Sequence, residues 1–89
     1  IQAFIQSIVQ QLKVGISVEN LAVEIAQRAM DDLYEDLGGK RPSTIAAACV
    51  YLAGKQLDVE IDAEDIAVCA AISTARMITI ADVIKVKTQ

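Results

Sequence analysis

The chain has 89 residues, of which 54% are hydrophobic and only 3% aromatic, so we expect one small domain with a core of Ala, Ile and Val. Its 8 basic and 12 acidic residues give a net charge of −4, the wrong sign for a domain whose main task is to bind phosphates. The chain contains no His, which removes the commonest general base and transition-metal ligand and argues against catalysis.

The N-terminal third of the chain predicts two amphipathic helices. In residues 1–12 and again in residues 21–33, apolar side chains recur at steps of three and four. We expect Gly15 to end the first helix and Ser17 to cap the second, with Glu19 in its first turn. The two stripes consist of Ile1, Phe4, Ile5, Ile8, Val9 and Leu12, and of Leu21, Ala22, Ile25, Ala26, Ala29, Met30 and Leu33.

An acidic cluster follows at the end of the second helix. Its four carboxylates oppose the helix dipole there, at a cost of ~0.3–1 kcal/mol each when exposed. The cluster is either a solvated surface patch, the commoner case, or a docking surface for a basic partner. Its members are Asp31, Asp32, Glu35 and Asp36.

The third predicted helix is apolar on nearly all of its faces. Pro42 suits its first turn, where the missing N–H costs nothing. Residues 44–53 then read Thr-Ile-Ala-Ala-Ala-Cys-Val-Tyr-Leu-Ala, almost without a polar atom. Because such a helix must be surrounded, we expect it at the centre of the domain, with Tyr51 reaching a polar partner or the surface.

The last third of the chain predicts a short helix, a tight turn and a longer helix. Asp62 can cap a helix at residues 63–70, and Ser73 can cap the helix that follows. Residues 71–72 connect them with the spacing of a helix-turn-helix, although many small helical proteins contain such a corner without binding DNA. The last helix is expected to run to about Val86, with a core-facing stripe of Met77, Ile80, Ala81 and Ile84.

No group of residues has the spacing of a catalytic, metal or nucleotide site. The carboxylates of residues 58–65 lack the central Gly and the final Glu of a calcium loop, and residues 38–40 lack the full spacing of a phosphate loop. Cys49 and Cys69 stand in apolar runs and are expected to be reduced core residues. We therefore expect no enzyme, no metal and no cofactor.

Membrane and export segments are not expected either. No stretch of ~18 apolar residues is free of charge, and no basic segment with a cleavage site opens the chain. Because the first residue is Ile1 rather than Met, we expect the chain to be a fragment of a larger protein.

Residues 39–53 resemble the signature stretch of general transcription factor IIB repeats. In that family a Gly-basic-x-Pro turn leads into an Ala-rich helix with a Tyr near its end, as Gly-Lys-Arg-Pro and Tyr51 do here. The order of the helices also resembles the cyclin box. The resemblance implies an all-α, five-helix cyclin-like fold over residues 1–89, as one repeat of a two-repeat protein. Pro42 is more typical of the second, C-terminal repeat, whereas the Ala-Cys-Val-Tyr run at residues 48–51 also resembles the first.

The resemblance also implies a function in transcription initiation. Members of the family form a non-catalytic bridge between TATA-box-binding protein, promoter DNA and RNA polymerase, and their second repeat places its helix-turn-helix in the major groove. The residues of this chain that fit DNA contacts are Lys40, Arg41 and Arg76, with Lys55 as a fourth candidate. The implied location is the nucleus in a eukaryote and the cytoplasm in an archaeon.

The sequence departs from the family where DNA would be read. The family's recognition helix has a hydroxyl, an apolar residue and an Arg, whereas this chain has Arg76, Met77 and Ile78. A usually basic position one turn later is Asp82, and a basic-basic-Thr run is replaced by residues 60–62, Glu-Ile-Asp. Because a bidentate Arg–guanine contact supplies ~1–3 kcal/mol of discrimination, we expect weak DNA binding with little sequence preference.

Two other functions stay open at this point. The acidic surface, and a recognition helix that lacks the family's usual basic residues, also suit a cyclin-box module that binds only protein, such as a kinase partner or a transcription regulator. The Lys-Arg-Pro-Ser spelling is close to that of the related polymerase III factor. A zinc ribbon and a second repeat in the full open reading frame would favour the bridging function.

Overall fold

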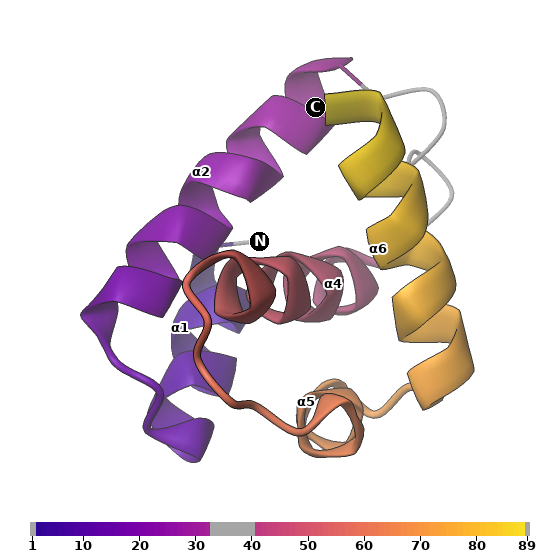
Figure 1. Ribbon diagram of the computed structural model, residues 1–89. Helices are drawn as coiled ribbons and strands as arrows, with labels where there is room; N and C mark the ends of the chain where they lie inside the picture. Colours follow the sequence, from indigo (N-terminus) through magenta and orange to yellow (C-terminus); the bar gives the residue numbers. More distant parts are fainter. Residues whose placement is uncertain (1, 33–40, 89) are drawn as a thin grey trace.

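The computed structural model describes residues 2–32 and 41–88, with side chains for residues 2–29 and 41–86. The other helices surround α4, with α1 and α2 on one side, α6 on the other and α5 across the lower edge (Figure 1). The all-α expectation is therefore confirmed over the described residues. These form five helices and no strand: α1 (Gln2–Leu12), α2 (Ile16–Asp32), α4 (Pro42–Gln56), α5 (Ala63–Ala70) and α6 (Thr74–Thr88).

Helices α1 and α2 each pack an apolar stripe into the core. The prediction is wrong for Phe4, which is 46% exposed, although the next residue, Ile5, is fully buried. Ile1 and Leu33 lie outside the described residues, and the side chain of Met30 is not described. The buried members of the two stripes are Ile5, Ile8, Val9, Ala22, Ile25, Ala26 and Ala29.

The end of α1 is set by Lys13 rather than by Gly15. Lys13 takes a left-handed conformation with a φ of 54°, and the N–H of Val14 donates a hydrogen bond to the carbonyl of Val9 (3.4 Å). This pattern closes the last turn of a helix and normally uses a Gly at the left-handed position. The sequence offered no Gly there, so the prediction placed the stop two residues too late.

The start of α2 also differs from the prediction. The helix begins at Ile16, and the carbonyl of Gly15 accepts its first hydrogen bond from the N–H of Glu19 (3.3 Å). Ser17 therefore lies inside the first turn and does not cap the helix. Glu19 is in the first turn as expected, where its charge is favourable against the dipole.

Helix α4 is the apolar centre of the fold, as predicted. Its residues from Thr44 to Val50 are all buried, and so are Leu52 and Ala53. Pro42 occupies the first turn, where it needs no hydrogen-bond acceptor. The run of Ala side chains lets the helices around α4 approach it closely, so the core is closed with little aromatic volume.

The α5–α6 corner has the expected caps. The Oδ1 atom of Asp62 accepts a hydrogen bond from the N–H of Glu64 (2.9 Å), and the Oγ atom of Ser73 accepts one from the N–H of Arg76 (3.1 Å). Ala71 adopts a left-handed φ of 58°, and the chain bends by 101° between the two helices. This geometry confirms a helix-turn-helix corner.

The inner faces of α5 and α6 complete the core. Met77, Ile80, Ala81 and Ile84 are buried, which confirms the stripe predicted for the last helix. In the part of the chain that the structure describes, no single helix is long and apolar enough to cross a membrane. The bent pair of α5 and α6 meets that test only jointly, by length and composition.

Candidate nucleic-acid interface and basic groove

The first turns of α6 present one cation to solvent. Arg76 and Thr79 are exposed, whereas Met77 is fully buried and Ile78 packs against the core. The hydroxyl of Thr79 donates to the carbonyl of Ala75 (2.9 Å), one turn earlier in the same helix. Of the three positions that match the family's recognition sequence, Arg76 alone thus has an exposed side chain.

The predicted DNA contacts lie at the starts of two helices. Arg41 is exposed directly before α4, and its carbonyl accepts hydrogen bonds from the N–H groups of Thr44 (3.0 Å) and Ile45 (3.2 Å). Arg76 is exposed in the first turn of α6. Lys40 lies outside the described residues, so a shared basic face of Lys40, Arg41 and Arg76 stays a prediction.

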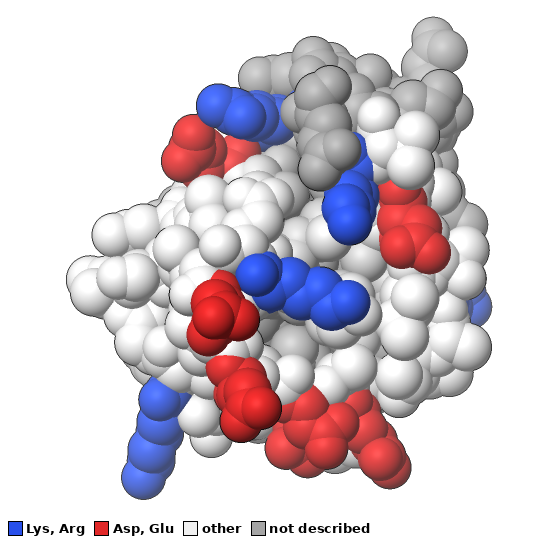
Figure 2. Space-filling view, viewed as in Figure 1, with Lys and Arg blue, Asp and Glu red and all other residues white. Residues whose placement is uncertain are grey.

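Exposed carboxylates lie on one side of the helix-turn-helix corner, in the first turn of α5 and in the loop before it. Figure 2 shows acidic side chains gathered along the lower edge of this face, where α5 and the loop before it lie in Figure 1. No group of three or more His, Cys, Asp or Glu among the described residues could hold a metal ion. The side chains of the predicted cluster at residues 31–36 are not described. The exposed carboxylates of the corner are Asp58, Glu60, Asp62, Glu64 and Asp65.

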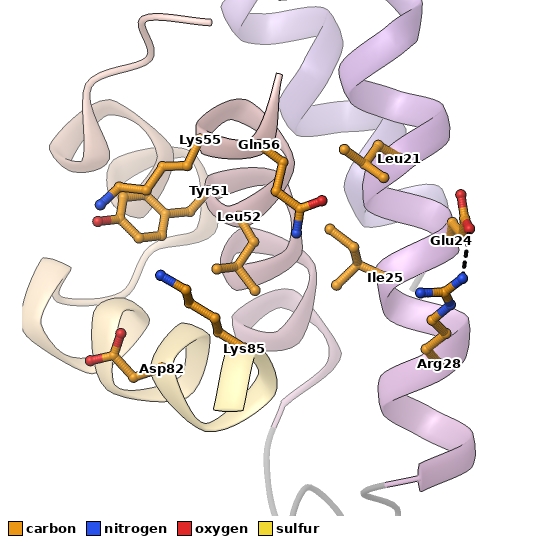
Figure 3. A pocket seen from close by; sticks show the side chains of 10 residues that line it. All are labelled: Leu21, Glu24, Ile25, Arg28, Tyr51, Leu52, Lys55, Gln56, Asp82 and Lys85. Atoms are coloured by element: carbon orange, nitrogen blue, oxygen red, sulfur yellow. Dashed lines mark hydrogen bonds and ion pairs between the residues drawn. The ribbon is translucent and has the colours of Figure 1, made fainter. Parts of the chain in front are cut away.

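A groove opens where the C-terminal half of α4 meets α2 and α6. Its volume is about 590 Å³, within the range typical of binding pockets. Leu21 and Ile25 point into it from α2, and Leu52 points into it from α4 (Figure 3). These three side chains give the groove an apolar floor.

The rim of the groove is basic. Arg28, Lys55 and Lys85 line it, together with the carboxylates Glu24 and Asp82. The groove thus has a net charge of +1 in a chain whose net charge is −4. Of the six basic residues whose side chains the structure describes, three line the groove, and the other three are Lys13, Arg41 and Arg76.

Neighbouring side chains hold Arg28 and Lys55 in place. Arg28 donates to Glu24 one turn earlier on α2 (3.2 Å), in an exposed pair that adds little stability. The Nζ atom of Lys55 lies 4.8 Å from the ring centre of Tyr51, within the range of a cation–π contact. Tyr51 raises the pKa of Lys55, first through a side-chain hydrogen bond and then through charge, and Asp82 raises it further. Lys55 therefore stays charged at neutral pH.

The two cysteines are free thiols in different surroundings. Cys49 is fully buried in α4, and this burial raises the pKa of its thiol to about 12. Cys69 is half-buried on α5 and packs against the core. Because the thiolate is the reactive form, Cys49 is inert at neutral pH.

The helices around α4 and the capped helix-turn-helix define a cyclin-like helical domain. The sequence model of the transcription factor TFIIB repeat matches residues 2–80. Since the match covers most of the chain, the chain belongs to the TFIIB repeat family, a family of non-catalytic transcription factors. No curated protein and no solved structure gave a match to the chain.

Sequence reasoning missed the groove. The spacing of Tyr51 and Lys55, and that of Glu24 and Arg28, predicts pairs on single helices because residues four apart share a face. This spacing can be read from the sequence, but it does not show that α2 and α6 flank the same end of α4. The groove depends on how the three helices pack together, and no local sequence pattern predicts that packing.

Proposed function

We propose that the chain is one cyclin-like repeat of a TFIIB-like initiation factor. In this function it bridges TATA-box-binding protein, promoter DNA and RNA polymerase without catalysing a reaction. The observation that supports the proposal is the family match over residues 2–80, in a fold whose α5 and α6 form a capped corner. Pro42 favours the second of two repeats in a larger protein, which would act in the nucleus of a eukaryote or the cytoplasm of an archaeon.

The surface charges suggest how the bridge divides its contacts. Lys40, Arg41 and Arg76 would touch phosphates, while the carboxylates of the corner oppose a close approach of the duplex. DNA would then contribute a weak, sequence-tolerant part of the assembly. Contacts with the other proteins of the complex would supply most of its affinity.

An electrophoretic shift assay tests the bridge directly. The full-length protein is added to TATA-box-binding protein on promoter DNA, and a slower ternary complex is expected. The double variant Arg41→Gln/Arg76→Gln should weaken this complex, while Lys13→Gln, an exposed cation in the α1–α2 turn, serves as the control. The absence of any ternary complex with the unaltered protein would contradict the proposal.

A cyclin-like module that binds only protein is the second candidate. The observation that favours it is the set of exposed carboxylates on α5 and the loop before it, together with the buried Met77. In the same assay this candidate predicts an identical ternary complex for the unaltered protein and for Arg41→Gln/Arg76→Gln. Binding to TATA-box-binding protein in the absence of DNA would then be undiminished.

A further inference from the structure

We propose that an open hollow between the end of α4 and the loop before α5 is a docking site for a short basic segment of a partner protein. The hollow has a volume of about 650 Å³ and is lined by residues 54–55 of α4 and 58–62 of the loop. An apolar side chain of the segment enters the hollow, and its Lys or Arg residues meet the carboxylates around it. The site goes beyond the proposed function, because it depends neither on promoter DNA nor on TATA-box-binding protein.

The loop beside the hollow is fixed to the last turn of α4. The N–H of Asp58 donates to the carbonyl of Lys55 (3.2 Å), and the N–H of Val59 donates to the carbonyl of Gly54 (2.9 Å). Asp58 takes the left-handed conformation that closes a helix end in this way, with a φ of 56°. Ile61 packs so closely over Gly54 that a Cβ atom there would lie 2.8 Å from its Cδ1 atom. A partner therefore meets a loop that needs little further ordering when it binds.

Apolar surface stays exposed at the hollow. Val59 lines it and is 36% exposed, and Leu57, two residues earlier, is 41% exposed. Ile61, also in the lining, is half-buried. An apolar side chain of a partner that is placed here would remove this surface from water, which favours binding.

The charges around the hollow select a basic segment. Asp58, Glu60 and Asp62 alternate with Val59 and Ile61 along the loop, and all three carboxylates are exposed. Two more exposed carboxylates follow in the first turn of α5. Figure 2 shows acidic side chains along this edge of the molecule. A segment that carries several cations can therefore pair with several of these carboxylates at once.

Other occupants fit the hollow less well. A nucleic acid carries negative charge along its whole backbone and would be repelled. Among the described residues no group of three or more His, Cys, Asp or Glu could hold a metal ion, so these carboxylates are not gathered around one point. Lys55 is the one basic residue in the lining, and its Nζ atom lies over the ring of Tyr51 (Figure 3). The separate carboxylates thus suit an elongated partner with separate cations.

The test measures the binding of a defined basic peptide to the 89-residue chain. The probe is a fluorescein-labelled peptide of about twelve residues in which pairs of Lys or Arg alternate with Leu, followed by fluorescence anisotropy. The double variant Asp58→Asn/Glu60→Gln should bind it roughly fivefold more weakly, because two charges at the hollow are lost. The matched control Glu19→Gln/Glu24→Gln, which removes two charges on α2, should bind like the unaltered chain.

Two further measurements separate docking from a general attraction of charges. Val59→Ser leaves every charge in place and should weaken binding about threefold, because the apolar contact is lost. Backbone amide NMR shifts on addition of the peptide should cluster at the end of α4, in the loop and in the first turn of α5. Thermal melts check that each variant is folded, and Asp62 is left unaltered because its side chain caps α5.

Three results would overturn the docking site. The first is no binding at peptide concentrations of about 1 mM. The second is an affinity equal to that of the unaltered chain for either Asp58→Asn/Glu60→Gln or Val59→Ser. The third is an equal loss of affinity in the two double variants, because it would reduce the binding to a general attraction by a chain with a net charge of −4. None of these results depends on TATA-box-binding protein, so a failure here is distinguishable from a failure of the proposed bridge.

Discussion

Helix α6 takes part in two surfaces of opposite character. Its first turns belong to the helix-turn-helix corner, where Arg76 is exposed and where the preceding helix α5 begins with the carboxylates Glu64 and Asp65. Its second half lines the groove with Lys85 and Asp82, opposite the cations of α2 and α4. The framework thus keeps a helix-turn-helix corner, while three of the six basic side chains that the structure describes line the groove instead.

The difference between the surfaces has a physical origin. The corner is held by caps and by buried apolar residues such as Met77, which fix the backbone without reference to the charges outside. Exposed positions such as Asp82 are free of that constraint. A family match therefore specifies the packing of this chain more firmly than the molecules that its surface binds.

The largest expected effect concerns α4, on which both surfaces rest. Ala47 is fully buried, so Ala47→Leu should overpack the core and lower the free energy of unfolding by about 1–3 kcal/mol. In a domain of this size each kcal/mol lowers the melting temperature by roughly 4–8 °C. Ala3→Leu, at an exposed position of α1, is the matched control and should leave the melt nearly unchanged. An unchanged melt for Ala47→Leu would place α4 at the periphery and remove the common framework.

A second prediction follows from the burial of Cys49. The pKa of its thiol is about 12 in the folded chain and about 8.5 in an unfolded one, so between these values the unfolded state alone loses the proton. Stability is therefore complete below pH ~8.5 and falls as the pH rises, by about 1.4 kcal/mol per pH unit from this group. Urea unfolding from pH 8 to pH 10 should show a steeper decline for the unaltered chain than for Cys49→Ala. Equal slopes would show that the thiol ionises as readily in the folded chain as in the unfolded one.

A third, smaller effect sharpens the description of the corner. Ala71 sits at a left-handed φ of 58°, a conformation that Gly adopts at lower cost. Ala71→Gly should therefore raise the free energy of unfolding by about 0.5–1 kcal/mol in urea titrations. Ala70→Gly, one residue earlier and inside α5, should lower it by about 1 kcal/mol. If both variants lose stability to the same extent, the corner does not have the backbone geometry described here.

The fold was predictable where a local signal decides it. The unbroken apolar run of α4 predicted a central position for this helix. Asp62 and Ser73 predicted the starts of α5 and α6, because their side-chain oxygens can cap a helix. The end of α1 was not predictable because Lys13, a residue that rarely adopts a positive φ, takes the left-handed position.

The candidate sites divide in the same way. Arg41 and Arg76 could be named from the sequence because they are basic residues in the segments that align with the family's turn and recognition helix, and both are exposed. The groove could not be named, because Lys55 and Lys85 are separated by thirty residues and meet only when α6 packs beside α4. Pairing on one helix is encoded by spacing, whereas pairing between helices is a result of the whole fold.

This chain retains the framework of its family, and our main expectation is that its helix-turn-helix corner reads DNA poorly. A fluorescence-anisotropy titration at two salt concentrations, with a promoter duplex and a scrambled duplex, tests it most directly. With Lys40, Arg41 and Arg76 as the phosphate contacts, the logarithm of the binding constant should fall with the logarithm of the salt concentration with a slope of roughly −3. We expect weak binding, with affinities for the two duplexes that agree within about threefold. Tight binding with a preference of about a hundredfold for the promoter duplex would contradict it.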